Sequence, residues 1–120
     1  MRRLSLLLVL MSAIALPAAG CGGDGGGGGD AQALSASDVI GMKSLHFKPG
    51  HVQVPVGQKI TWRNDESVPH DVKADSGASF SSKSFGKDGT FSWTPDKAGT
   101  VKYECTLHPG MDGTIDVVAK

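Results

Sequence analysis

The chain has 120 residues, with 12 basic and 12 acidic side chains that give a formal net charge of zero. This length allows one modest domain and a leader, and no basic stripe with interleaved aromatic residues supports nucleic-acid binding. The only two cysteines are Cys21 and Cys105, which excludes a framework of several disulfides.

The first 20 residues have the features of a secretion signal. Arg2 and Arg3 precede an apolar run from Leu4 to Leu16, and the small residues Ala18-Ala19-Gly20 follow. The apolar run is too short for a comfortable membrane span. We therefore expect residues 1–20 to be a signal peptide and the chain to be exported.

Residues 21–37 are expected to form a lipidated, flexible tether. The segment Ala18-Ala19-Gly20-Cys21 resembles a bacterial lipobox, which implies a diacylglycerol on Cys21. A plain signal peptide with an incidental cysteine is the alternative. Residues 22–30 hold seven glycines and two aspartates, a composition that cannot bury apolar surface. The resemblance implies a lipid anchor on the outer face of a bacterial cytoplasmic membrane, or a location in the periplasm.

Residues 38–120 show short runs in which apolar and polar residues alternate, separated by turn signals such as Pro49-Gly50. No stretch has helical periodicity. The runs lie at 45–47, 52–56, 60–62, 68–72, 80–85, 91–93, 101–105 and 115–117. They predict one all-β domain, an antiparallel Greek-key β-sandwich of about seven or eight strands.

Three metal-binding side chains lie close together before the last expected strand. Cys105, His108 and Met111 follow one another at three-residue steps, and Gly113 would let the chain turn into that strand. A thiolate, two imidazoles and a weak thioether form the ligand set that suits copper. This loop therefore indicates a copper site that needs one more histidine.

The missing histidine must come from elsewhere in the chain. His46 and His51 read as surface residues, on the polar side of a strand and beside a turn. His70 follows Val68-Pro69 and shares a face with two valines, so a satisfied core histidine is its ordinary interpretation. Because the loop lacks a second imidazole, His70 is the candidate fourth ligand.

Three other functions compete for the same residues. An immunoglobulin-like domain would explain Tyr103 and Cys105, but it needs a second cysteine on an earlier strand. A zinc site would leave Met111 unexplained. An enzyme that uses Cys105 and His108 as nucleophile and base lacks an orienting group and an oxyanion hole.

Two blocks of sequence resemble the cupredoxins, small blue copper proteins of the plastocyanin and amicyanin type. Phe47 to Asn64 with Val68 to Val72 resembles their paired N-terminal strands, and Tyr103 to Val118 resembles their ligand loop and last strand. The two-residue gap between His108 and Met111 is similar to the short loop of amicyanins.

The resemblance implies a single copper ion with His70, Cys105, His108 and Met111 as ligands. It implies electron transfer rather than enzymatic catalysis, with His108 and Pro109 as the port for electrons. A monomer that docks redox donors and acceptors near His108 is expected. A carrier or storage protein that delivers copper to an acceptor is the alternative function.

The resemblance also implies a second layer of residues around the copper ligands. Cupredoxins commonly have asparagine after the first histidine, where this chain has Asp71. We expect the Thr106 hydroxyl to donate to the Asp71 carboxylate, and the Asp71 amide to donate to the Cys105 sulfur. The charge of Asp71 would lower the reduction potential.

Overall fold

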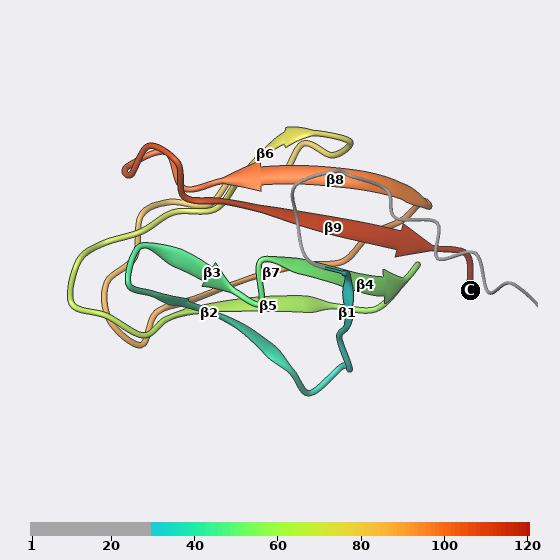
Figure 1. Ribbon diagram of the computed structural model, residues 1–120, viewed down its shortest axis with the longest axis horizontal. Coiled ribbons are helices and arrows are strands. Elements are labelled where there is room, and N and C mark those ends of the chain that lie inside the picture. The colour runs from blue at the N-terminus through green and yellow to red at the C-terminus, as the bar shows by residue number, and fades with distance from the viewer. Residues whose placement is uncertain (1–29) are drawn as a thin grey trace, which may run out of the picture.

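The computed structural model describes residues 30–120, and nine β-strands lie within them (Figure 1). Their bounds are β1 Gln32–Ala33, β2 Val39–Lys43, β3 His46–Lys48, β4 His51–Pro55, β5 Ile60–Asn64, β6 Lys73–Ser76, β7 Thr90–Trp93, β8 Gly99–Glu104 and β9 Asp112–Val118.

The strands form two sheets that pack as a sandwich. One sheet has the order β1-β4-β9-β8-β6 and the other β3-β2-β5-β7. The pairs β1–β4, β4–β9 and β2–β5 are parallel, and the remaining pairs are antiparallel. The predicted all-β sandwich is confirmed, but its sheets are mixed, because strands far apart in the sequence pair side by side.

The sheet begins before residue 38, where we expected the domain to start. Gln32 and Ala33 pair with β4, and Leu34 donates its amide to Gln53 O at 3.0 Å. Leu34 is also buried, so one apolar side chain fastens an otherwise small and polar segment. The expected signal peptide, Cys21 and the glycine run lie outside the described residues.

Residues 30–120 contain no helix of the length and apolarity that crossing a bilayer would require.

Aromatic rings fill the space between the sheets. Trp62 of β5 is fully buried, and its ring centroid lies 5.4 Å from that of Tyr103 on β8 and 5.6 Å from that of Phe80. Side chains of a strand point alternately to its two faces, and this decides which of them are buried. On β4, Val52 and Val54 face the core, while Gln53 between them faces solvent. Desolvation by burial raises the pKa of Tyr103 far above its usual range.

Three connecting segments that hold candidate site residues lie at the same end of the sandwich. β8 runs toward Glu104 and β9 starts at Asp112, so the loop 105–111 lies at this end, on the left in Figure 1. The β2–β3 turn and the long segment between β5 and β6 lie there as well.

The segments 68–72 and 80–85, which we expected to be strands, meet through isolated bridges instead. His70 pairs with Phe85, and Lys73, the first residue of β6, pairs with Ser81. Pro69 has no N–H group, so a regular ladder cannot extend through it. The segment nevertheless holds His70 firmly, because His70 and Phe85 exchange both backbone hydrogen bonds, at 3.1 and 2.8 Å.

Candidate metal centre

Two separate segments bring three metal-binding side chains together. Cys105 directly follows β8 and His108 lies three residues along the loop, while His70 comes from the segment bridged to Phe85. The Cys105 Sγ atom lies 3.6 Å from His70 Nδ1 and 3.5 Å from His108 Nδ1. One ligand atom from each residue lies within 4.8 Å of the others.

These separations and donor types fit one copper ion. Two ligand atoms at about 2.0–2.3 Å from a shared metal lie roughly 3.3–3.8 Å apart, which matches both sulfur–nitrogen distances. Cys105 and His70 are buried and His108 is half-buried, so the cluster reaches the surface at His108. One soft thiolate and two imidazoles are the strong donors that such copper sites use.

Met111 ends the same loop and is buried, with 2% of its surface exposed. The loop closes on itself through two backbone hydrogen bonds, from Cys105 N to Met111 O at 2.9 Å and from Met111 N to His108 O at 3.1 Å. Gly110 supplies a φ of 84°, a left-handed conformation that glycine adopts without strain. The loop's own backbone therefore holds Cys105, His108 and Met111 in place.

Glu66 contacts His70 and was not identified from the sequence. Its Oε1 lies 2.6 Å from His70 Nε2, and its carboxylate also accepts the amides of Ser44 and Leu45. Burial disfavours the charge of Glu66, but these hydrogen bonds outweigh it and hold the carboxyl pKa below its usual range. A glutamate in a polar loop has no pattern that reveals such a contact.

Asn64 is a second residue that sequence reasoning missed. It is fully buried at the end of β5, and its side-chain amide donates to Val68 O at 2.8 Å and to Phe85 O at 3.0 Å. Its Oδ1 accepts the Glu66 amide at 2.9 Å. One side chain thus ties together both sides of the segment that carries His70.

Asp71 and Thr106 meet as expected across the two segments. The Thr106 amide donates to Asp71 Oδ1 at 2.6 Å, and the Thr106 hydroxyl donates to Asp71 Oδ2. The expected hydrogen bond from the Asp71 amide to the Cys105 sulfur is not formed in the described part of the chain. Asp71 therefore fastens the ligand loop through its side chain.

Exposed apolar side chains gather at the end of the sandwich that carries His108. The large hydrophobic side chains that stay exposed in residues 30–120 are Leu45, Val68, Leu107 and Val118. The first three belong to the β2–β3 turn, the segment before His70 and the ligand loop, all at the same end of the sandwich. We call Leu45, Val68 and Leu107 the apolar rim.

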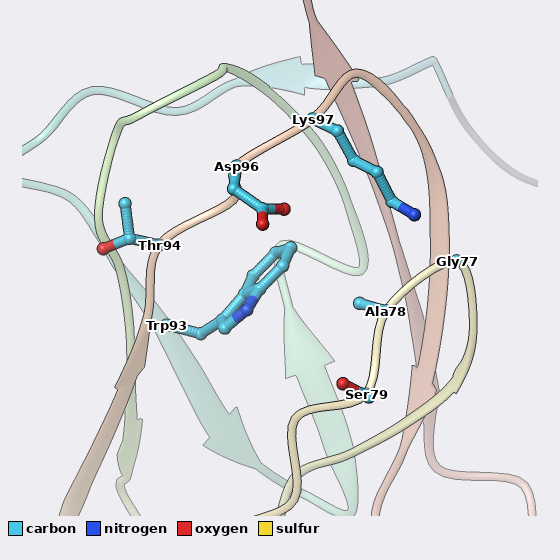
Figure 2. A pocket seen from close by; sticks show the side chains of 7 residues that line it. All are labelled: Gly77, Ala78, Ser79, Trp93, Thr94, Asp96 and Lys97. Atoms are coloured by element: carbon cyan, nitrogen blue, oxygen red, sulfur yellow. The ribbon is translucent and has the colours of Figure 1, made fainter.

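A separate cavity lies at the far end of the molecule. It measures about 550 Å³ and is lined by Gly77, Ala78, Ser79, Trp93, Thr94, Asp96 and Lys97. Figure 2 shows the Trp93 indole between the two loops that form it. None of the metal-binding residues lines this cavity. Neither His46 nor His51 belongs to the metal-binding cluster: His46 Nδ1 contacts Ser44 O at 2.6 Å, and His51 Nε2 lies 2.7 Å from Asp116 Oδ2.

Comparison with known proteins agrees with this geometry. Residues 35–118 match the model of the copper binding proteins of the plastocyanin/azurin family. Amicyanin of Paracoccus denitrificans is 31% identical over 91 residues, which span 72% of this chain and 70% of amicyanin. Plastocyanin of Sambucus nigra is 35% identical over 88 residues, 62% of this chain and 89% of plastocyanin.

A solved structure of a reduced amicyanin variant superposes with a TM-score of 0.65 at 29% identity, covering 71% of this chain and 85% of that one. The family match, the shared sandwich and the His–Cys–His cluster lead to one conclusion. The chain belongs to the plastocyanin/azurin family of copper-binding proteins, the cupredoxins.

Proposed function

We propose that the protein carries single electrons by means of one copper ion held by His70, Cys105, His108 and Met111. The observation that carries this proposal is the clustering of one thiol and two imidazoles within 4.8 Å. A copper ion bound there supplies a reversible change between Cu(I) and Cu(II).

The chain's own residues keep the donors in place. The backbone of His70 is fixed to Phe85 and its ring to Glu66, while Asp71 fastens the loop through Thr106. Donors that are held before the metal binds move little when its charge changes, so little reorganisation opposes electron transfer.

His108 is the port through which electrons enter and leave. Its ring is half-buried, and the neighbouring Leu107 and Pro109 are exposed. A reduced partner docked on the apolar rim gives up one electron there, and an oxidised partner accepts it at the same face. Under this proposal the protein performs no bond-making chemistry.

The spectrum of the copper-loaded protein tests the proposal. We expect intense visible absorption and a reversible one-electron couple, and Cys105→Ser should reduce the absorption at least tenfold because the thiolate is lost. Cys21→Ser, which changes the other cysteine, should leave the spectrum unchanged. A colourless Cu(I) protein that readily hands its metal to an acceptor would instead identify a copper carrier, the alternative that the comparisons do not favour.

We propose further that the chain is exported and anchored by a lipid on Cys21, with residues 1–20 as the signal peptide and the residues between Cys21 and β1 as the tether of the copper domain. The charged start, apolar run and small residues before Cys21 support this. Expressed in a bacterium, the chain should sediment with membranes and carry an added lipid mass, and Cys21→Ser should become soluble. A wild-type chain that is soluble without added mass contradicts the anchor.

A further inference from the structure

Glu66 selects the tautomer of the neutral His70 ring. A carboxylate only accepts hydrogen bonds, so its 2.6 Å contact requires a proton on His70 Nε2. A neutral imidazole carries one proton, and the lone pair then lies on Nδ1, the atom 3.6 Å from Cys105 Sγ. His70 is completely buried, so water does not offer a competing partner.

The Glu66 carboxylate is itself held from two further sides. Its Oε2 accepts the Ser44 amide at 2.9 Å, and its Oε1 accepts the Leu45 amide at 3.1 Å. The Glu66 amide donates to the buried Asn64. Each carboxylate oxygen therefore has a fixed donor, and the side chain cannot swing away from His70 without losing them.

The turn that supplies these amides has an unusual backbone. Ser44 and Leu45 have φ values of 54° and 58°, in the left-handed region that side-chain-bearing residues rarely adopt. Successive amides in such a turn point toward one concave side and bind an anion there. The Glu66 carboxylate occupies that position and accepts both amides.

We propose that Glu66 is the positioning residue of the copper centre, fixing the His70 tautomer from an anion-binding turn and lowering the reduction potential by its charge. The proposal rests on the proposed function, because it takes His70 as a ligand. A carboxylate bonded to a ligating histidine makes the ring more basic and favours the more positive metal. The same carboxylate connects His70 to Leu45 of the apolar rim.

Glu66→Gln tests the contribution of the charge. The amide has nearly the same shape, but its single oxygen cannot accept from both the Ser44 and Leu45 sides. We expect the equilibrium to shift about tenfold toward the reduced form, a rise of ~59 mV in the potential of the copper-loaded protein. Asp65→Asn is the matched control, since it removes the adjacent carboxylate, which pairs with Arg63. Asp65→Asn should change the potential far less than Glu66→Gln does.

The His70 ring proton gives a readout that does not depend on copper. In the metal-free and Cu(I) proteins, NMR should show a slowly exchanging proton on Nε2, and Glu66→Gln should speed its exchange at least tenfold. If that variant folds poorly, Leu45→Gly should be added, because glycine adopts the left-handed turn without the carboxylate.

An unchanged potential and unchanged proton exchange in Glu66→Gln would overturn the positioning role and leave the proposed function intact. A protein with no reversible copper couple would overturn the proposed function, while the metal-free spectrum would still decide the tautomer.

Discussion

At the scale of single residues, Asp71 is the position where the surroundings of the metal centre differ from the usual cupredoxin pattern. The position commonly holds asparagine in those proteins, but here a carboxylate accepts both the amide and the hydroxyl of Thr106. An asparagine could keep this geometry, because its oxygen accepts from the amide and its NH₂ group donates to the hydroxyl. The difference between the two residues at this position is therefore mainly one of charge.

We expect Asp71→Asn to raise the reduction potential. Losing one negative charge near a partly exposed centre is worth on the order of 1 kcal/mol, or roughly 40 mV, after screening by solvent. Voltammetry of the copper-loaded protein measures the change, and Asp75→Asn on the exposed side of β6 is the control. A potential that stays the same or falls in Asp71→Asn would refute the idea.

At the scale of strands, the β8–β9 pair shows a close approach that no periodicity predicts. Gly113 lies opposite Tyr103 in the ladder, and a Cβ atom at this position would lie 2.3 Å from Tyr103 Cζ. We expected Gly113 to turn the chain, but it lies inside β9. Its absent side chain leaves room for the buried tyrosine ring.

Gly113→Ala should therefore destabilise the metal-free protein by about 1–3 kcal/mol, since either the strand or the Tyr103 ring must shift. Denaturant unfolding measures this. Gly86→Ala is the control, because a Cβ there meets open space, and its stability should stay within about 0.5 kcal/mol of the wild type. Equal effects of the two substitutions would show that Gly113 is not a packing position.

The strands that could be predicted from the sequence are those whose own residues alternate. Val52 with Val54, and Ile115 with Val117, mark β4 and β9 in this way. β2 contains a glycine and β6 is short and polar, so their strand pairing depends on neighbours that are distant in the sequence. Local patterns do not record such partners, which is why both strands were missed.

At the scale of the whole molecule, the two ends of the sandwich differ in character. The metal-binding cluster and the apolar rim share one end, and the remaining exposed large hydrophobic residue, Val118, ends β9 at the other. The His70, Cys105 and His108 cluster was predictable because residue types and spacing point to its chemistry. Glu66 and the rim were not, since they become neighbours only when separate turns meet.

This difference between the two ends predicts that redox partners dock on the apolar rim and not on the opposite end. Leu107→Ser should slow electron self-exchange between Cu(I) and Cu(II) copies about tenfold, because both docking copies lose roughly 0.7 kcal/mol of apolar contact. The potential should remain unchanged. NMR line broadening measures the exchange, and Val118→Ser at the opposite end should leave it unaffected. Equal slowing in both variants would exclude the rim as the contact surface.

The ligand loop is closed largely by its own backbone, so its sequence can vary more freely than that of the strands. Two of its backbone hydrogen bonds join residues 105, 108 and 111 to one another, and the Thr106 amide adds a tie to Asp71. The stretch between Glu104 and Asp112 can therefore be exchanged as a module, lengthened or shortened, while the β8–β9 register persists. Changes in this segment can adjust the metal's properties while the sheets keep their pairing, as long as the contact between Thr106 and Asp71 is kept.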